Sequence, residues 1–384
     1  MTLTAYLLFW ASVTLITYTY LLYPLLLVAA RILRPKLQAR NASWVPSVSL
    51  VIAVYNEESI IWSKIKNLEK IDYLREKIEF LFGSDGSTDR TNEILTSISS
   101  PAVHIRVFPR RRGKAAVLND LIPQATGEAI VLSDANTLYD PNTIKKLVSH
   151  FADKRIGAVC GRLVLTPKRD LAGNVSEVAY WTYENFIKQL ESDLSTTVGA
   201  TGAVYAIRKT LFAPLPEQKT VMDDFLIPME IIRKGYKVKY EPEALAYETV
   251  SDNISDEYRR RVRIGAANFH GISEYASLLH PRYGFVSFAL WSHKILRWCV
   301  PFLIVALTLS AIMLAGVSEV YKFFLATETV FLVLALAGFI CEKVKLKIGF
   351  LNLPYYFVAI NTALFVGFVK FLLGKQRATW DVIR

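Results

Sequence analysis

Residues 48–58 read Val-Ser-Leu-Val-Ile-Ala-Val-Tyr-Asn-Glu-Glu, so a short run of aliphatic residues ends in polar side chains. Such a run predicts a buried strand, and its polar end predicts a ligand site at the edge of a sheet. Similar strand candidates lie at residues 78–83, 104–108, 129–133 and 157–165, with helix candidates beginning near Glu57, Thr88, Lys114 and Pro141. Strands that alternate with helices indicate an α/β fold with a parallel sheet, which we expect over residues 41–282.

Long apolar runs lie on both sides of this domain. Hydrophobic residues make up 52% of the 384 residues, and the mean hydropathy is +0.29. Residues 5–33 carry no charge before Arg31, and this run is long enough to cross a hydrocarbon core of about 30 Å. Three further spans are expected near residues 299–317, 323–341 and 351–373. The chain is therefore expected to be a multi-pass membrane protein.

The charges beside these runs predict the orientation. Arg31, Arg34, Lys36 and Arg40 follow the first run, so the positive-inside rule places the N-terminus outside and the α/β domain in the cytoplasm, at the inner (plasma) membrane. One N-terminal span and three C-terminal spans then put the basic tail, residues 375–384, outside, against the same rule. Either one run is re-entrant or the segment near residue 290 crosses the membrane.

We therefore divide the chain into four parts. Residues 1–40 form a transmembrane helix with a basic flank, and residues 41–282 form the α/β domain. Residues 283–298 carry three basic side chains among apolar residues, which favours an interfacial amphipathic helix. Residues 299–384 hold the C-terminal transmembrane helices and the basic tail.

Composition argues against some classes of protein. The formal net charge of +11 suits an anionic bilayer or a phosphate-bearing substrate. No module with interleaved basic and aromatic residues is present, so nucleic acid is not expected as a partner. Cys160, Cys299 and Cys341 lack metal-ligand spacing, and two of them lie in apolar runs. A disulfide framework is therefore not expected, and the catalytic part is expected in a reducing compartment.

Polar clusters follow the first strand candidates. Glu57 could accept hydrogen bonds from a ribose or a base, or simply favour a helix start. Residues 84–91, Ser-Asp-Gly-Ser-Thr-Asp-Arg-Thr, could hold a nucleotide or close a loop and cap a helix. Residues 110–114, Arg-Arg-Arg-Gly-Lys, open a helix whose N-terminus and cations could hold a diphosphate, with a solvated charge run as the alternative.

Three later clusters carry acids or arginines. Asp134 and Asn136, two residues apart at the end of a strand candidate, are expected to face the same side. Their oxygens would suit Mg²⁺ or Mn²⁺ bound to substrate phosphates, although a turn is the more ordinary explanation. Asp223 and Asp224 precede a helical stretch, which they could cap, or one of them could be a general base. Residues 259–263 include four arginines that could bind lipid phosphates or a departing diphosphate.

Taken in order, these pieces resemble the family 2 glycosyltransferases, in the membrane branch that includes cellulose, chitin, hyaluronan and poly-N-acetylglucosamine synthases. The resemblance covers residues from about 45 to 270 and the layout of the membrane segments. It implies a GT-A fold, a Rossmann-like nucleotide-diphospho-sugar transferase domain. It also implies Mg²⁺ or Mn²⁺, a nucleoside-diphosphate sugar donor such as a UDP-sugar, and inversion at the anomeric carbon.

On the donor side, the resemblance implies that Asp85 recognises the base, assisted by Glu57 and Lys114. Asp134 corresponds to the first aspartate of the Asp-x-Asp metal motif, and Asn136 stands where a second acid is usual. That replacement removes a negative charge from the metal site, but the amide carbonyl can still coordinate a cation.

On the acceptor side, residues 199–205, Gly-Ala-Thr-Gly-Ala-Val-Tyr, are similar to the glycine-containing strand that lines the acceptor site. The resemblance implies acceptor contacts for Gly202, Ala203 and Asp223. Asp224 matches the aspartate proposed as the base of the family, and Asp223 replaces the glutamate that usually precedes it, which keeps the charge.

Residues 260–264 occupy the place of the Gln-x-x-Arg-Trp motif, with Arg263 as its diphosphate-binding arginine. Arg260 and Ile264 replace the glutamine and the tryptophan. In processive enzymes that tryptophan helps to form the acceptor platform, so its replacement argues against long-chain processive synthesis.

The sequence thus predicts a membrane-bound inverting glycosyltransferase that acts on a polysaccharide or oligosaccharide acceptor in cell-surface synthesis, with Asp224 as the base. A membrane lipid, such as a polyprenyl phosphate or a glycolipid, is the alternative acceptor. A sugar-phosphate nucleotidyltransferase would carry a glycine-rich phosphate loop, which residues 53–58 lack. An inactive membrane scaffold would not be expected to retain the acids and Lys114. The sequence identifies no export or polymerisation partner.

Overall fold

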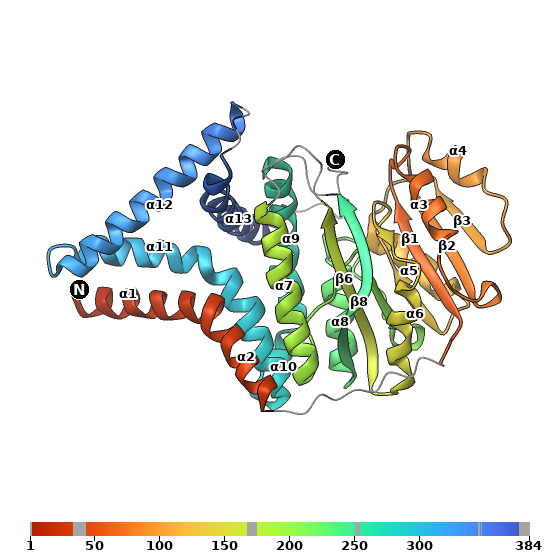
Figure 1. Cartoon of the computed structure of the whole chain (residues 1–384), viewed down its shortest axis with the longest axis horizontal. Helices are drawn as coiled ribbons and strands as arrows, with labels where there is room; N and C mark the ends of the chain where they lie inside the picture. The colour runs from red at the N-terminus through yellow and green to blue at the C-terminus, as the bar shows by residue number, and fades with distance from the viewer. Residues whose placement is uncertain are drawn as a thin grey trace.

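The computed structural model describes residues 2–33, 44–166, 175–249, 254–344, 346 and 348–375. An α/β domain lies on one side of the molecule, and long apolar helices extend from it on the other (Figure 1). The predicted combination of an α/β domain with flanking membrane helices is therefore confirmed. The basic flank Arg34, Lys36 and Arg40, and the tail beyond Lys375, lie outside the described residues.

The sheet has eight strands in the order β3-β2-β1-β4-β7-β6-β8-β5. They are β1 (Val48–Val54), β2 (Ile78–Asp85), β3 (Val103–Phe108), β4 (Ala129–Leu132), β5 (Leu138–Tyr139), β6 (Ile156–Thr166), β7 (Tyr205–Arg208) and β8 (Lys237–Thr249). The neighbours β3, β2, β1 and β4 are parallel. β7 runs antiparallel to both β4 and β6. The prediction of a parallel sheet is therefore correct for the first four strands and wrong for the sheet as a whole.

The prediction of a strand at residues 199–205 needs correction. The glycine-containing segment forms a loop, and β7 begins only at Tyr205. Gly199 has a φ of +130°, a backbone conformation that interrupts a strand and that side-chain-bearing residues rarely adopt. The loop turns back toward the start of the next helix, and this places its glycines beside Asp224.

Helices cover both faces of the sheet. Those of the domain are α3 (Ile61–Leu68), α4 (Thr91–Thr96), α5 (Lys114–Gln124), α6 (Thr143–Val148), α7 (Val175–Leu194), α8 (Asp223–Arg233) and α9 (Ile254–Glu274), with short 3₁₀ turns at Arg75–Lys77, Ser149–Ala152, Lys209–Leu211, Ala276–Leu279 and Pro281–Tyr283. Side chains of β1 alternate between two buried cores: Leu50 and Ile52 pack with α3 and α6, whereas Val51 packs with α5 and the core around α8. The result is a three-layer arrangement with a sheet in the middle.

The predicted helix starts are only partly correct. α5 begins at Lys114 as expected, after Gly113 with a φ of +104°. The helices expected near Glu57, Thr88 and Pro141 begin a few residues later, because the intervening residues form turns. One such turn is closed by the Ile60 N–H, which donates to the Glu57 carbonyl at 3.0 Å.

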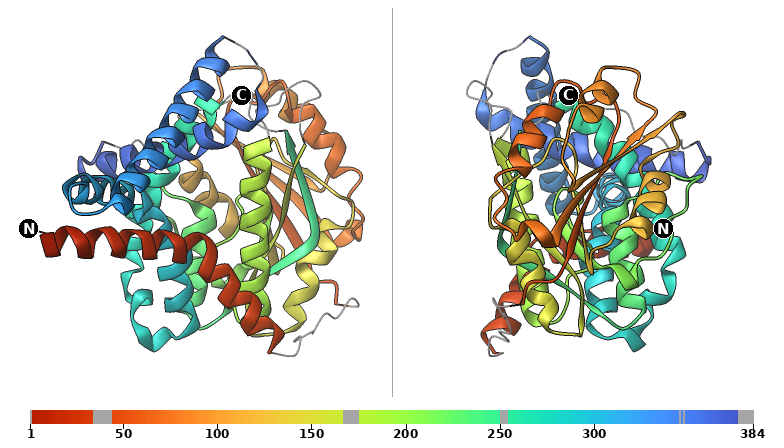
Figure 2. Two further views of the ribbon diagram at one scale, coloured as in Figure 1. Left: turned by 60° about the vertical axis from the view of Figure 1, so that its left-hand side comes forward. Right: turned by 90° about the vertical axis from the view of Figure 1, so that its right-hand side faces the viewer.

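Four described helical segments are long and apolar enough to cross a membrane, at residues 3–32, 285–314, 319–343 and 349–372. They consist of α1 (Thr2–Thr17), the π-helix η1 (Tyr18–Leu22), α2 (Tyr23–Ile32), α10 (Phe285–Ala289), the π-helix η8 (Leu290–Ile295), α11 (Leu296–Leu314), α12 (Glu319–Lys343) and α13 (Gly349–Leu372). The segment expected as a separate interfacial helix, residues 283–298, instead continues into α11 through η8. In Figure 2, left, the first helix bends where α1 gives way to α2, at the π-helix η1, as π-bulges commonly cause.

Candidate active site

Two loops at the carboxyl ends of β1 and β2 hold each other in place. Asn56 has a φ of +52°, and its Oδ1 accepts a hydrogen bond from the Thr88 N–H at 2.8 Å. The Glu57 N–H donates to Thr91 Oγ1 at 2.7 Å. Glu57 therefore lies at the carboxyl end of β1, where ligands of α/β domains bind. Its predicted contact with the donor stays a prediction.

Asp85, the last residue of β2, is fully buried. Its carboxylate accepts hydrogen bonds from the Arg112 N–H at 2.7 Å and the Gly113 N–H at 2.8 Å. Gly86 lets this loop approach, because a Cβ there would lie 2.6 Å from the Arg111 backbone nitrogen. Asp85 thus holds the segment that opens α5 in the position from which Lys114 reaches the site.

The basic run 110–114 does not act as one solvated patch. The Arg111 guanidinium lies 3.7 Å from the ring centroid of Tyr55, and Arg112 pairs with Asp120. Both arginines are therefore engaged with side chains of the domain. Of the residues in the run, Lys114 is the one whose cation reaches the acids at the centre of the site.

Lys114 joins two carboxylates that are far apart in the sequence. Its Nζ lies 2.8 Å from Asp134 Oδ1 and 3.0 Å from Asp223 Oδ1. The Tyr205 hydroxyl donates to the other oxygen of Asp223 at 2.8 Å. Burial lowers the pKa of Lys114, but the two carboxylates outweigh burial and hold that pKa above its ordinary value. Burial raises the pKa of Asp134, but pairing with Lys114 holds it below its ordinary value. Lys114 and Asp134 are therefore both charged at neutral pH.

Asp224 directly follows Asp223 in the first turn of α8. Its Oδ2 accepts a hydrogen bond from the Gly202 N–H at 2.9 Å, and its backbone carbonyl accepts one from the Ala200 N–H at 2.7 Å. Burial, followed by the charge of Asp223, raises the pKa of Asp224 to about 6, although Lys114 partly opposes this rise. A carboxylate with a pKa near the working pH is suited to general-base catalysis.

The expected geometry of the metal motif needs correction. β4 ends at Leu132, and residues 135 and 136 form a turn, so Asp134 and Asn136 do not share a strand face. Asn136 is exposed and Asp134 is half-buried. The two residues still lie on one short loop at the carboxyl end of β4.

Lys64, which the sequence analysis missed, holds this loop in place through hydrogen bonds. Lys64 is fully buried, and its Nζ donates to Ser133 Oγ at 2.7 Å and to the Thr137 carbonyl at 2.5 Å. Burial lowers the pKa of Lys64 to about 7 against the opposing charge of Asp134. The sequence does contain a signal, because Lys64 interrupts the apolar face of α3 that includes Ile65.

The donor set fits a cation that is shared with a substrate. Among the described residues, no group of three or more His, Cys, Asp or Glu side chains could hold a metal ion. Asp134 and Asn136 can supply oxygen atoms, the ligand type that Mg²⁺ and Mn²⁺ prefer, and Mg²⁺ usually binds through one or two carboxylates together with substrate phosphates. These two residues therefore suit a cation whose remaining ligands come from a diphosphate and water.

The four arginines of residues 259–263 do not share one role. Arg259 pairs with Asp256, Arg260 with Glu177 and Glu257, and Arg261 with Glu257. These three arginines tie α9 to α7 and to its own first turn, so the run does not form one phosphate-binding patch. The positive charge of Arg263 is the last of the causes that lower the pKa of Asp134, after those of Lys114 and Lys64.

Two of the three predicted acceptor residues, Gly202 and Ala203, differ in their surroundings. The third, Asp223, is buried and pairs with Lys114. A Cβ added to Gly202 would lie 3.3 Å from Asp224 Oδ2, so the glycine permits close approach to that carboxylate. Ala203 is buried, and its carbonyl accepts a hydrogen bond from the Tyr139 hydroxyl at 3.1 Å. Its side chain packs in a core cluster with Leu163. Direct acceptor contact is therefore expected at Gly202 and not at the Ala203 side chain.

Lys188 of α7 is a second buried cation that the sequence analysis missed. Its Nζ donates to the Ala200 carbonyl at 2.9 Å and to Thr201 Oγ1 at 2.8 Å. The loop whose Gly202 N–H contacts Asp224 is thus anchored to α7. As with Lys64, the available signal is a lysine beside buried apolar residues of a helix, here next to Ile187.

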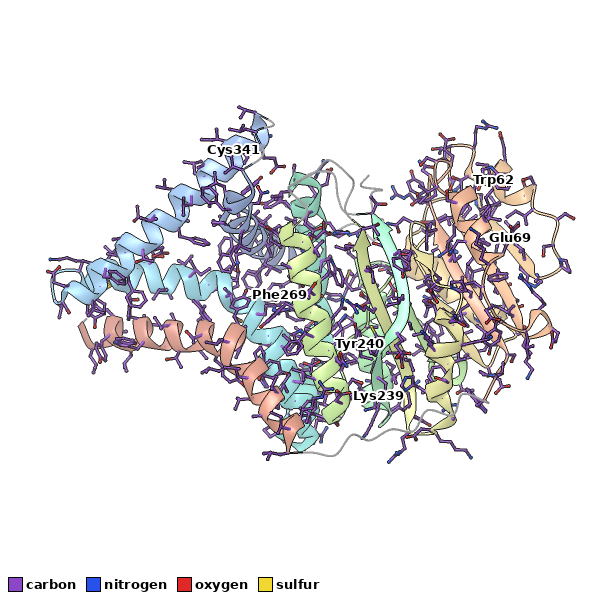
Figure 3. All side chains as sticks on the ribbon, in the orientation of Figure 1. Trp62, Glu69, Lys239, Tyr240, Phe269 and Cys341 are labelled. Atoms are coloured by element: carbon purple, nitrogen blue, oxygen red, sulfur yellow. The ribbon has the colours of Figure 1, made fainter. Side chains whose placement is uncertain are left out.

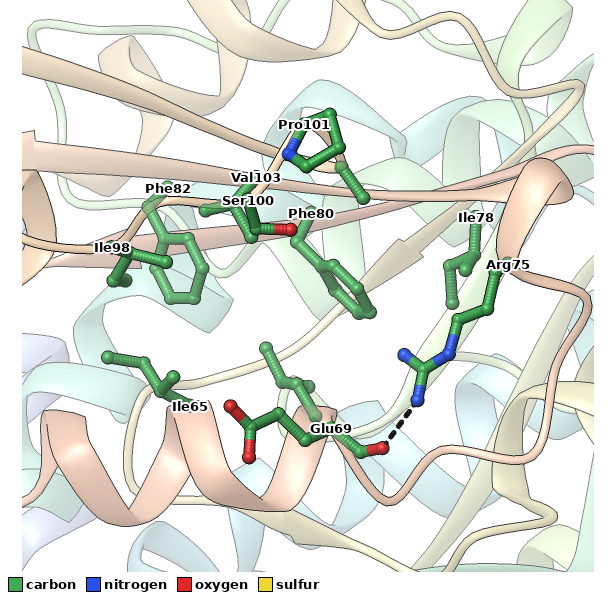
Figure 4. Close-up of a pocket in the computed structure, with 12 residues that line it drawn as sticks. Ile65, Glu69, Arg75, Ile78, Phe80, Phe82, Ile98, Ser100, Pro101 and Val103 are labelled. Atoms are coloured by element: carbon green, nitrogen blue, oxygen red, sulfur yellow. Dashed lines mark hydrogen bonds between the residues drawn. The ribbon is translucent and has the colours of Figure 1, made fainter.

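A separate cavity of about 290 Å³ lies between α3 and the outer strands β2 and β3 (Figure 4). Its walls are mostly apolar, and at its edge Arg75 donates to the Glu69 carbonyl at 2.7 Å. It is lined by Ile65, Leu68, Glu69, Arg75, Ile78, Phe80, Phe82, Ile98, Ser100, Pro101, Ala102 and Val103. None of the predicted site residues belongs to it, so we place the active site at the acids and not in this cavity.

Comparisons with known proteins agree with this fold. Residues 49–214 match the family model described as glycosyl transferase family 2. The chain is 26% identical over 227 residues to a poly-beta-1,6-N-acetyl-D-glucosamine synthase of Staphylococcus aureus strain COL, which covers 58% of this chain and 55% of that protein. A synthase of the same name from Staphylococcus epidermidis is 26% identical over 226 residues, 57% of this chain and 54% of that protein. The chain therefore spans about half the length of the curated relatives it matches.

A solved structure extends the similarity to the whole fold. A mannosyltransferase from Pyrobaculum calidifontis, in complex with GDP-Man and Mn²⁺, superposes with a TM-score of 0.73 at 23% identity and covers 96% of this chain and 100% of that one. The α/β domain accordingly has a GT-A glycosyltransferase fold. The match over residues 49–214 and the GT-A fold are those expected of a family 2 glycosyltransferase domain, and the flanking helices are long and apolar enough to cross a membrane.

Proposed function

We propose that this protein is a membrane-bound inverting glycosyltransferase that transfers one sugar at a time from a nucleoside-diphosphate sugar to a hydroxyl of a carbohydrate acceptor. The observation that carries the proposal is the position of Asp224. Its carboxylate, with a pKa of about 6, follows directly on Asp223, which Lys114 links to Asp134. A base and a diphosphate site are therefore next to each other at the carboxyl edge of one sheet.

The donor would lie between the loops that end β1, β2 and β4. Glu57 and Asp85 are the residues expected at the nucleoside end, although the Asp85 carboxylate acts through the loop that it holds. Lys114 and Arg263 supply positive charge toward the diphosphate. Asp134 and Asn136 would hold Mg²⁺ or Mn²⁺, which when bound would neutralise charge on the departing diphosphate.

The transfer itself is a single displacement. Asp224 accepts the proton of the acceptor hydroxyl as that oxygen forms a bond to the anomeric carbon, and the bond from this carbon to the diphosphate breaks. The nucleoside diphosphate leaves with the bonding electron pair, and Lys114 and Arg263 stabilise its charge. Attack from the face opposite the leaving group inverts the anomeric carbon. The Gly202 N–H orients the Asp224 carboxylate at the start of this step.

The synthases that match this chain by sequence support a carbohydrate acceptor, as in cell-surface polysaccharide synthesis. One observation favours a second acceptor class, a membrane lipid such as a polyprenyl phosphate or a glycolipid. Ile264 stands where a processive enzyme of the resembling family has a tryptophan, so the chain lacks that part of an acceptor platform. We also propose that the domain faces the cytoplasm at the plasma membrane, because Arg31 and the basic residues after it follow the first span.

The proposal is tested by giving the purified protein, in lipid nanodiscs, a panel of labelled nucleotide sugars with Mn²⁺ or Mg²⁺. Carbohydrate and lipid fractions are then analysed by mass spectrometry. Transfer from one donor to a carbohydrate, lost in Asp224→Asn, is the expected result. A label found only in lipid supports the second acceptor class, and a product ladder would contradict single transfer. Absence of transfer from every donor would contradict the proposed activity.

A further inference from the structure

The helix α13 is long enough to cross a membrane but is placed differently from the other spans. Its 24 residues correspond to about 36 Å at 1.5 Å per residue, so length alone permits a crossing. In Figure 1, α1, α11 and α12 extend across the plane of the view. The helix α13 is strongly foreshortened, so its axis crosses their direction. The contacts of α13 show which part of the membrane region it occupies.

Both halves of α13 contact α9, a helix of the catalytic domain. Near its start, Tyr356 and Ala359 form a buried cluster with Ile254. In the second half of α13, the helix backbones approach closely, since a Cβ at Gly367 would lie 2.8 Å from the Val262 carbonyl. This sequence of contacts shows that α13 stays beside α9 along most of its length.

The end of α13 also remains beside the catalytic domain. The Phe269 ring of α9 lies 4.9 Å from that of Phe368 and 6.2 Å from that of Phe371. Figure 3 labels Phe269 at the boundary between the catalytic domain and the membrane helices. If α13 crossed the bilayer, Phe371 would lie about 30 Å from the domain along the membrane normal. Contact with Phe269 is incompatible with that distance.

The helix α9 cannot itself lie in the hydrocarbon core. Residues 256–263 include two acids and four arginines. Each such charge costs about 2.5–3.5 kcal/mol at the centre of a bilayer on insertion scales. The helix is therefore at or outside the membrane surface, and α13, which follows it, is at the same level.

The contacts of α13 with the crossing helices agree with this level. Phe302, near the start of α11, lies 5.4 Å from Phe365 and 4.9 Å from Phe368 between ring centroids. Gly338, near the end of α12, approaches Leu351, whose carbonyl would be 2.6 Å from a Cβ at that glycine. The start of α11 and the end of α12 are the ends on the catalytic-domain side. Their opposite ends pack instead with Phe9 of α1, in a cluster that contains no described residue of α13.

We infer that α13 lies along the surface of the membrane on the catalytic-domain side, with its exposed apolar side chains in the acyl and head-group boundary, and does not cross. Exposed apolar residues for this contact are Phe350, Leu353, Phe365 and Leu372. Basic residues flank them: Lys343, Lys345 and Lys347 come before the helix, and Lys370 and Lys375 stand at its end. Such a helix suits an anionic lipid leaflet. Lys375, at the end of α13, then lies on the side of the catalytic domain, which removes the conflict with the positive-inside rule.

The inference is tested by labelling single cysteines with a membrane-impermeant maleimide in a background where the three native cysteines are replaced by serine. Lys375→Cys reports the end of α13. Glu76→Cys, exposed on the catalytic domain, and Gly316→Cys, in the open loop between α11 and α12, are the matched controls. Lys375→Cys is expected to be labelled on the same side as Glu76→Cys and opposite to Gly316→Cys. Labelling together with Gly316→Cys would overturn the inference.

This pattern separates the inference from the proposed orientation of the domain. Reaction of Glu76→Cys in intact spheroplasts would contradict a cytoplasmic domain, while agreement between Glu76→Cys and Lys375→Cys would still support the surface position of α13. A second measurement uses nitroxide labels at Leu353, Phe365 and Leu372 in nanodiscs. A surface helix predicts similar depths for all three. A crossing helix predicts a difference of about 18 Å between the first two, from 12 residues at 1.5 Å each, and that result would also overturn the inference.

Discussion

Replacing Asp224 with asparagine should lower activity and raise stability in the same variant. The substitution keeps the size of the side chain and an oxygen that can accept the Gly202 N–H, but it removes the charge and the ability to accept a proton. Loss of a general base typically lowers kcat by about 10²–10⁴-fold. Donor binding should change far less, because Lys114 pairs with Asp134 and Asp223 and not with Asp224.

The stability effect follows from the pKa of Asp224, which burial and Asp223 raise from 3.8 to about 6. Because the folded pKa is above the unfolded one, the folded state binds more protons between these values, and stability falls as pH rises from about 4 to about 6. Above pH 6, ionisation of the buried carboxylate lowers the free energy of unfolding. The shift of about two pKa units corresponds to roughly 3 kcal/mol. Asparagine has no such cost, so the variant should unfold at a temperature roughly 5 °C or more higher at pH 7.5.

The assay combines transfer rates with thermal unfolding in the same detergent, from pH 5 to pH 8. In the native protein, kcat/KM should fall about tenfold per pH unit below pH 6, because the base becomes protonated. Asp153→Asn is the matched control, since Asp153 pairs with Arg155 at the surface, away from the site. Near-normal transfer by Asp224→Asn would refute the role of the base. Lower stability of that variant at pH 7.5 would refute the cost assigned to the buried charge.

Other perturbations test the rest of the site. Removal of divalent cations by a chelator should abolish transfer, and Mn²⁺ or Mg²⁺ should restore it; full activity without a cation would contradict the metal role. Lys114→Met should raise KM for the donor at least tenfold, measured by initial rates, because it leaves two carboxylates without their shared cation. Gly202→Ala should lower kcat, whereas Gly316→Ala, with open space around it, should not; equal rates would contradict the close approach to the base. Glu184→Gln should cost about 3–5 kcal/mol of stability, seen as a lower unfolding temperature, because Glu184 pairs with two cations of the first C-terminal membrane helix; an unchanged unfolding temperature would count against this pairing.

Much of the fold could be predicted from local patterns. The strand β1 is buried at all seven positions, and its continuous aliphatic run already shows this. The start of α5 at Lys114 follows from Gly113, which favours the conformation found there. The membrane helices were recognised because apolar length is a property of the sequence alone.

The short strands in the antiparallel part of the sheet could not be predicted from local patterns. β7 has four residues and β5 has two, too few for a periodicity. Their pairing partners in β4, β6 and β8 are distant in sequence, so pairing decides that these segments are strands at all. The same reason explains why the glycine-containing loop before Tyr205 was assigned to a strand.

The sequence by itself determined the chemical groups of the site, because Lys114, Asp134, Asp223 and Asp224 carry their charge and their place in the motif order wherever the chain folds. Only the tertiary structure decided their relations. The 2.8 and 3.0 Å contacts that join Lys114 to two acids depend on the relative positions of α5, β4 and α8. The position of α13 relative to the bilayer is decided in the same way. Its hydrophobic length permits a crossing, whereas its contact with Phe269 of the charged helix α9 prevents one. Burial and distance set both results, and neither is a property of a single segment of sequence.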